Sequence, residues 1–221
     1  MKKILSAIFA SFSAIFLAAS AQAADVVPNA KAGEGKIAMC IGCHGIPNYH
    51  TAFPEVYHVP KIAGQSATYL QAALKEYQEG KRKFATMEAI AAPLTEQDMA
   101  DIAAYYSQQA PAKAPAVVPA PNPVVKAMLD KANCVSCHGS NFSKPLDGSM
   151  PKIAGQHADY LYAALKAYAA PETGVAYGRS NAIMRGVING QFTLPELRQL
   201  ADYLGSIPGD VDTVAESRFR K

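Results

Sequence analysis

The sequence lacks a strong excess of charge of either sign. Its 221 residues include 21 lysines and arginines against 18 aspartates and glutamates, a formal net charge of +3 at pH 7. Because nucleic-acid-binding domains need a concentrated basic face, this near balance argues against nucleic acid as a partner. Beyond residue 23, no apolar run approaches the roughly 20 residues that a transmembrane helix needs. The sequence therefore predicts neither a nucleic-acid-binding protein nor a membrane-spanning one.

Residues 1–23 have the pattern of a secretory signal peptide. Lys2 and Lys3 precede an apolar run of fifteen residues, and an Ala-Gln-Ala sequence that ends at Ala23 supplies the small residues that signal peptidase requires. The apolar run is shorter than a membrane span, which favours a cleaved signal over an anchor. We therefore predict export to the periplasm, with Ala24 as the mature N-terminus.

Cysteine is scarce, and its four copies fall in two identical patterns. Cys-x-x-Cys-His occurs at residues 40–44 and again at residues 134–138. Four cysteines in an exported protein are expected to form two disulfides, and an isolated Cys-x-x-Cys is typical of a redox pair or of half a zinc site. The sequence lacks the βαβ context of thioredoxin-like redox pairs, and a zinc site would leave both adjacent histidines without a role.

Cys-x-x-Cys-His is the attachment signal for c-type haem. Two thiols three residues apart bond to the two vinyl groups on one porphyrin edge, and the histidine that follows reaches the iron from the same side. We therefore predict two covalently bound haem c groups with iron. The predicted attachment residues are Cys40, Cys43, Cys134 and Cys137, and the proximal iron ligands are His44 and His138.

The two patterns belong to a duplication. The segment PKIAGQ occurs at residues 60–65 and 151–156, and a YLxxALK segment follows each copy. The copies are offset by 94 residues at the cysteines and by 91 at PKIAGQ, which is what loop insertions produce between equivalent domains. Between them, residues 111–123 contain five prolines, so an extended connector is expected. The predicted organisation is a signal peptide over residues 1–23, a first domain over 24–110, a linker over 111–123 and a second domain over 124–221.

Each copy has the periodicity of helices, and no run alternates as a strand would. Apolar residues recur at helical spacing over residues 70–77 and 161–168. A capping box is expected at the start of the last helix in each copy, and a further helix is expected before each cysteine pair. The predicted capping residues are Thr95 with Asp98, Thr193 with Glu196, and Asn122 before Pro123. The predicted fold class is all-α.

The second axial ligand of each iron must come from a segment well downstream of the histidine. Met87 and Met184 occupy equivalent positions, 97 residues apart, in stretches expected to be irregular before the last helix of each copy. Axial methionine raises the reduction potential of a c-type haem, so these two residues are the predicted ligands. Core packing is the alternative role for any single methionine, and it is the one expected for Met39, Met99 and Met128.

Histidine is the competing axial ligand. A pair of bis-histidine haems would need equivalent histidines in both copies. His50 and His58 have no equivalents in the second copy, and His157 corresponds to Ser66. These three histidines are therefore expected to be surface or loop residues.

The tandem Cys-x-x-Cys-His domains, the repeated PKIAGQ with its YLxxALK helix, and a methionine before a capped helix resemble the cytochrome c4 family over the whole mature chain. The resemblance implies two fused class I cytochrome c domains, His–Met ligation at both irons, and haems near each other across a pseudo-twofold interface. It also implies that Pro60 and Pro151 accept a hydrogen bond from the proximal histidines through their carbonyls. Arg82 and Arg179 are candidates to meet haem propionates.

The function expected from these features is single-electron transfer in a respiratory chain rather than enzymatic catalysis. A haem with both axial positions filled by protein has no open site for a substrate. A quinol-oxidising complex is the expected donor and a terminal oxidase the expected acceptor, with at most loose association with the membrane. The alternatives are a di-haem subunit of a dehydrogenase, such as a sulfide-oxidising flavocytochrome, and a di-haem peroxidase, against which Met87 and Met184 argue.

Overall fold

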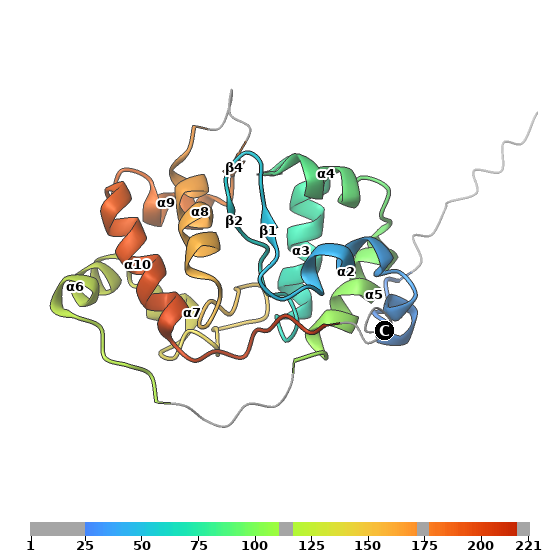
Figure 1. Ribbon diagram of the computed structural model, residues 1–221, viewed down its shortest axis with the longest axis horizontal. Helices are drawn as coiled ribbons and strands as arrows, with labels where there is room; N and C mark the ends of the chain where they lie inside the picture. Colours follow the sequence, from blue (N-terminus) through green and yellow to red (C-terminus); the bar gives the residue numbers. More distant parts are fainter. Residues whose placement is uncertain (1–24, 111–116, 172–176, 216–221) are drawn as a thin grey trace, which may run out of the picture.

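Figure 1 shows the computed structural model, which describes residues 25–110, 117–171 and 177–215. The predicted signal peptide lies outside these residues, as do residues 111–116 of the predicted linker. The remaining linker residues before Pro123 have no regular secondary structure. Within the described part, none of the helices has the length and apolar character needed to cross a membrane.

The described residues form two helical domains whose helices follow the same order (Figure 1). The first domain contains α1 (Ala30–Glu34), α2 (Ala38–His44), α3 (Ala67–Gln78), α4 (Ala85–Ala91) and α5 (Glu96–Ser107). The second contains α6 (Pro123–Ala132), α7 (Cys134–His138), α8 (Ala158–Ala169), α9 (Ala182–Ile188) and α10 (Leu194–Ser206). The all-α prediction is confirmed.

The two long helices of each domain pack against each other, α3 against α5 and α8 against α10. Their apolar stripes meet because residues three and four apart lie on one helix face. The core of the first domain contains Ile37, Ile41, Leu70, Ile102 and Tyr106. The core of the second contains Val125, Leu129, Leu161, Leu197, Leu200 and Leu204.

The predicted helix caps are present. The backbone N–H of Asp98 donates to Thr95 Oγ1 (3.1 Å), and the N–H of Thr95 donates to the Asp98 carboxylate (3.0 Å). The same reciprocal box joins Thr193 and Glu196 at the start of α10. Before α6, the side chain of Asn122 accepts a hydrogen bond from the third residue beyond it, and proline opens the helix. Local sequence thus sets where these helices begin.

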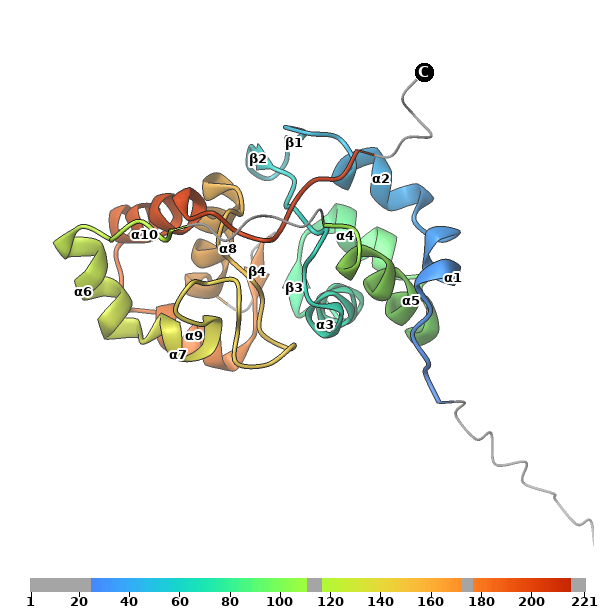
Figure 2. The same cartoon turned by 90° about the horizontal axis from the view of Figure 1, so that it is seen from below.

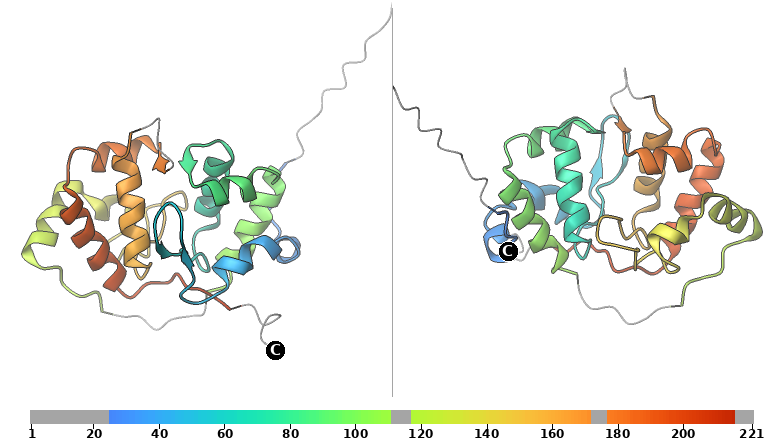
Figure 3. Two further views of the ribbon diagram at one scale, coloured as in Figure 1. Left: turned by 45° about the horizontal axis from the view of Figure 1, so that its top comes forward. Right: turned by 180° about the vertical axis from the view of Figure 1, so that it is seen from behind.

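The expectation of no strands was wrong in detail, because the described residues include four strands of two residues each. They are β1 (His50–Thr51), β2 (Tyr57–His58), β3 (Arg82–Lys83) and β4 (Gly178–Arg179). β1 and β2 form an antiparallel hairpin within the first domain, whereas β3 pairs with β4 across the two domains. Two residues are too few to produce an alternating pattern in the sequence. Figure 3 shows the short strands between the two groups of helices.

The interface between the domains is built by the repeated PKIAGQ segments and has pseudo-twofold symmetry. The N–H of Lys61 donates to Gln156 Oε1, and the N–H of Lys152 donates to Gln65 Oε1, both at 2.9 Å. Each glutamine Nε2 donates in return to the carbonyl of the same lysine at 2.8 Å. Each lysine Nζ also donates to the carbonyl of the glycine before the partner glutamine. In the pair β3–β4, Arg82 lies opposite its own equivalent.

The segment after α10 leaves the second domain and runs along the first (Figure 2). Ala63 and Asp212 form an antiparallel bridge, with hydrogen bonds of 3.2 Å and 2.9 Å between their backbones. The buried side chain of Val211 lies beside this bridge. The C-terminal segment therefore connects the two domains, in addition to the contacts of the PKIAGQ segments.

Candidate haem sites

Each Cys-x-x-Cys-His segment folds as a short helix that ends at its histidine. α2 ends at His44 and α7 ends at His138, so the first cysteine and the histidine, four residues apart, lie on one helix face. All four cysteines are free of disulfides and partly buried. Burial, with a smaller contribution from the neighbouring cysteine, raises the pKa of Cys40 to about 11, and burial raises that of Cys134 to about 11. These are not the acidic thiols of a redox pair.

The two histidines are held in one orientation by equivalent contacts. His44 Nδ1 lies 2.9 Å from the carbonyl oxygen of Pro60, and His138 Nδ1 lies 2.9 Å from that of Pro151. Since a carbonyl oxygen only accepts, Nδ1 carries the proton, and Nε2 is left with a lone pair. Burial lowers the pKa of both imidazoles, against the opposing effect of the proline carbonyl. Both rings are therefore neutral with a free Nε2, the form that ligates iron.

Met87 and Met184 lie on short helices rather than in the irregular stretches expected for them. Met87 is on α4 and Met184 is on α9, and both side chains are half-buried. The helices are seven residues long, too short to show a clear apolar stripe in the sequence. Of the methionines expected in the core, Met99 and Met128 are buried, but Met39 is 71% exposed, which contradicts the expectation. Met39 precedes Cys40 on the side of α2 that borders the cavity described next.

One cavity of about 720 Å³ runs through both domains and brings the predicted site residues together. Its lining is mostly apolar, which favours a large flat cofactor over water. The predicted residues on its wall are Cys40, Cys43, His44, Met87, Cys134, Cys137, His138 and Met184. Each domain thus presents two thiols, one neutral imidazole and one thioether to the same space, which is the donor set of a c-type haem.

A buried cluster of arginine and tyrosine side chains also lines the cavity. Arg82 Nη2 donates to the Tyr69 hydroxyl (2.7 Å), and its equivalent Arg179 Nη2 donates to the Tyr160 hydroxyl (3.0 Å). Arg82 is 4% exposed, and its Nε has no hydrogen-bond partner among the described residues. Because a buried, unsatisfied cationic donor is costly, this atom fits a site that receives an anionic group such as a haem propionate.

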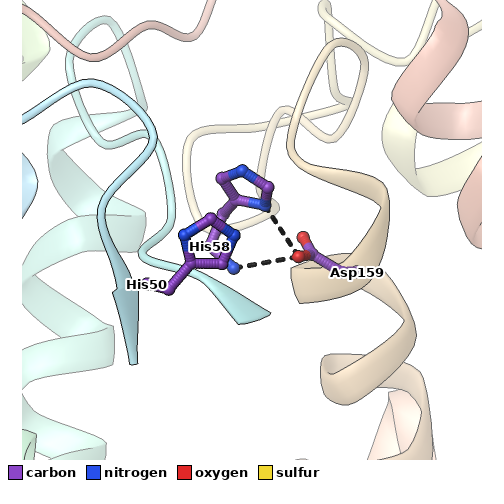
Figure 4. Close-up of side chains that lie close together, drawn as sticks. All are labelled: His50, His58 and Asp159. Carbon is purple, nitrogen blue, oxygen red and sulfur yellow. Dashed lines mark hydrogen bonds and ion pairs between the residues drawn. The ribbon is translucent and has the colours of Figure 1, made fainter. Parts of the chain in front are cut away.

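The sequence reasoning missed a cluster of histidines between the domains. His50 and His58 face each other on β1 and β2, with ring centroids 3.8 Å apart. The His157 ring stacks on His58 at 4.5 Å, and Asp159 accepts a hydrogen bond from His58 Nδ1 at 2.7 Å (Figure 4). His50 is exposed, as expected, but none of the three stands alone in a loop. Nothing in the local sequence shows that residues about 100 positions apart meet.

Comparison with known proteins agrees with this geometry. The family model described as "Cytochrome c" matches residues 30–109 and again residues 125–208. The fold and the repeated site therefore define a c-type cytochrome with two haem domains, and the chain carries two covalent haem c groups. The chain belongs to the di-haem cytochrome c4 family, whose members serve in electron transport.

The similarity extends over most of the chain. The cytochrome c4 of Stutzerimonas stutzeri is 30% identical over 191 residues, which cover 80% of this chain and 88% of the relative. A thiosulfate dehydrogenase electron acceptor of the same species is 30% identical over 218 residues, 90% of this chain and 93% of the relative. The crystal structure of reduced cytochrome c4 from Pseudomonas stutzeri has a TM-score of 0.60 at 27% identity, covering 82% of this chain and all of that one.

Proposed function

We propose that this chain is an exported carrier of single electrons whose two irons each have histidine and methionine as axial ligands. His44 and Met87 would ligate the first iron, and His138 and Met184 the second. Two cysteines attach each haem, Cys40 with Cys43 and Cys134 with Cys137. One observation carries the proposal: the predicted haem residues of the two domains lie at equivalent places on one cavity wall. Each domain contributes a neutral imidazole and a half-buried thioether.

The residues of the chain prepare each site for electron exchange. A bound haem supplies a one-electron couple, and two protein ligands leave it without an open position for a substrate. The proline carbonyls fix the imidazole planes and strengthen their donation. Arg82 and Arg179 place positive charge where propionates would lie. This closed arrangement supports a carrier rather than an enzyme.

The reciprocal interface supports exchange of electrons between the two sites. Backbone and side-chain hydrogen bonds of the PKIAGQ segments hold the domains in one arrangement. Two sites on one continuous cavity would let the chain hold two electrons or pass one through its length. We place this carrier in the periplasm, between a quinol-oxidising complex and a terminal oxidase, with residues 1–23 as its signal peptide and the domains at 24–110 and 124–221.

A second candidate function is that of a di-haem electron acceptor for a periplasmic dehydrogenase. It is favoured by the similarity to two proteins named thiosulfate dehydrogenase electron acceptor, from Thiomonas intermedia and Stutzerimonas stutzeri. A sulfide-oxidising flavocytochrome is another enzyme that uses such a subunit. Purification from native periplasm distinguishes the two roles, because a free carrier elutes alone, whereas a subunit elutes with its dehydrogenase.

Replacement of the two methionines tests the proposed ligands. A thioether on ferric haem produces a weak near-infrared charge-transfer band. Met87→Ala and Met184→Ala should each remove about half of that band and lower the reduction potential of one haem, since axial methionine favours the ferrous state. Met99→Ala, which removes a buried core methionine, is the matched control and should keep the band. An intact band in the double variant would show that other residues ligate the irons.

A further inference from the structure

His50, His58 and Asp159 bring potential metal ligands together at the domain interface. One ligand atom of each residue lies within 4.8 Å of the other two. Figure 4 shows the two imidazoles of the β1–β2 hairpin beside the Asp159 carboxylate at the first turn of α8. None of the three residues is assigned to a haem, and of the three only His50 also lines the haem cavity.

The hairpin positions the two imidazoles on one face. His50 and His58 are directly opposite each other in the antiparallel pair, and such cross-strand neighbours have Cβ atoms only about 5 Å apart. Their ring centroids are 3.8 Å apart with the planes tilted by 44°. The hairpin thus holds two nitrogen ligands side by side before any ion arrives.

The carboxylate is held in place by the opposite domain and by the hairpin itself. Asp159 Oδ2 accepts hydrogen bonds from the backbone N–H of His58 (3.0 Å) and from His58 Nδ1 (2.7 Å). Asp159 Oδ1 accepts from the N–H of Tyr160 (2.8 Å). His58 and Asp159 are both half-buried, whereas His50 is exposed.

A purely structural hydrogen bond between His58 and Asp159 would account for the positions of these two residues but not for that of His50. His50 takes no part in the hydrogen bond between His58 and Asp159, yet its ring lies against the His58 ring. The PKIAGQ contacts are symmetric, whereas this contact is not, because the offset of 91 residues relates His58 to Ser149 and Asp159 to Thr68. The equivalent position in the other half therefore offers hydroxyls in place of imidazole and carboxylate.

We propose that His50, His58 and Asp159 form a binding site for one divalent transition-metal ion, of which Zn²⁺ is the representative, bridging the two domains. Two imidazoles and one carboxylate suit Zn²⁺, Cu²⁺ or Ni²⁺, whereas Mg²⁺ and Ca²⁺ prefer sets of oxygen ligands. Three protein ligands leave the remaining coordination positions to water. Because the ligands come from both domains, binding stabilises their docked arrangement.

Isothermal titration of the oxidised protein with both haems attached tests this site. After chelator treatment, Zn²⁺ should bind at one ion per chain, and Mg²⁺ should produce no saturable heat. His50→Gln and Asp159→Asn should each weaken Zn²⁺ binding at least tenfold, on the order of the effect of losing a metal-site residue. The haem absorption spectrum of each variant should match that of the parent, which shows that the fold is retained.

Two matched controls separate this site from others on the surface. Asp147→Asn removes an exposed carboxylate that accepts hydrogen bonds from Ser149, the residue that the offset of 91 relates to His58. His157→Ser removes the imidazole that stacks on His58 without joining the ligand group. Both should leave Zn²⁺ binding nearly unchanged. The proposal is overturned if Zn²⁺ shows no saturable binding, if His50→Gln has no effect, or if the controls weaken binding as much as Asp159→Asn does.

Discussion

The two domains share one fold, but polar contacts hold the first helix of the first domain and apolar packing holds that of the second. In the first domain, the N–H of Asn29 and the amine of Lys36 donate to the Asp101 carboxylate, at 2.8 Å and 2.6 Å, and Asp101 is 2% exposed. In the second domain, the apolar residues Val125, Met128 and Leu129 of α6 are buried instead. The two domains therefore keep the position of their first helix, while the contacts that hold this helix differ.

Gly33 explains why polar contacts hold the first helix of the first domain. A Cβ atom at Gly33 would lie 2.1 Å from the carbonyl oxygen of Asp101, so α1 lies directly against the backbone of α5. That distance leaves no room for a layer of apolar side chains. Hydrogen bonds and an ion pair to Asp101 then take their place, and the buried Asp101 carboxylate is satisfied by several donors.

The largest effect is expected from a cavity in the second domain. Leu197 on α10 has no exposed surface, and Leu197→Ala should lower the free energy of unfolding of that domain by about 2–5 kcal/mol. Calorimetry of the protein with both haems should show that the unfolding temperature of the second domain falls, while that of the first domain is unchanged. Met99→Ala, at the equivalent position of α5, should do the converse. One shared transition that shifts equally in both variants would show that the domains unfold together.

A smaller effect, confined to the first domain, is expected from Gly33→Ala. The new Cβ has no space beside the Asp101 carbonyl, so α1 must move away from α5, at a cost of about 1–3 kcal/mol in unfolding free energy. Gly35→Ala is the matched control, because its Cβ would meet only one backbone oxygen at 3.5 Å. Equal stability of the two variants in chemical denaturation would contradict the close packing of α1.

The smallest effect is expected in acid. Hydrogen bonds from Lys36 and Thr95 lower the pKa of Asp98 to about 2, from an ordinary value of 3.8. A carboxylate with a lowered folded-state pKa stabilises the fold above its ordinary pKa, and this contribution is lost as the pH falls from about 4 to about 2. Thermal unfolding between these pH values should therefore depend less on pH in Asp98→Asn than in the parent.

The second domain supplies the comparison for this acid effect. Its equivalent residue, Glu196, has a pKa lowered mainly by hydrogen bonds within its own capping box. Glu196→Gln should therefore change the acid response chiefly through the capping box, because Lys131 of α6 makes only the smallest contribution to the lowered pKa of Glu196. If Asp98→Asn and the parent lose stability in parallel, the ion pair with Lys36 does not contribute to the folded state.

Several features of the site follow from short stretches of sequence. The spacing of Cys40, Cys43 and His44 predicts covalent haem attachment, and the comparisons confirm two such groups. The capping box at Thr95 was predicted from two residues three positions apart, because a cap depends on the backbone of its own helix turn. The duplication predicts Met87 as an axial ligand, because Met184 occupies the equivalent position in the second copy. The sequence does not predict that Met87 lies on a helix.

The long helices, the duplication and the haem motifs can be read from the sequence alone, because each depends on groups separated by a few covalent bonds or by a fixed repeat. Two features appear only in the folded protein: Gln65 and Gln156 exchange hydrogen bonds with the opposite lysines, and His50, His58 and Asp159 meet. These contacts depend on how two folded surfaces dock. Docking is set by the summed shape and hydrogen bonding of both domains, which no local pattern in the chain contains.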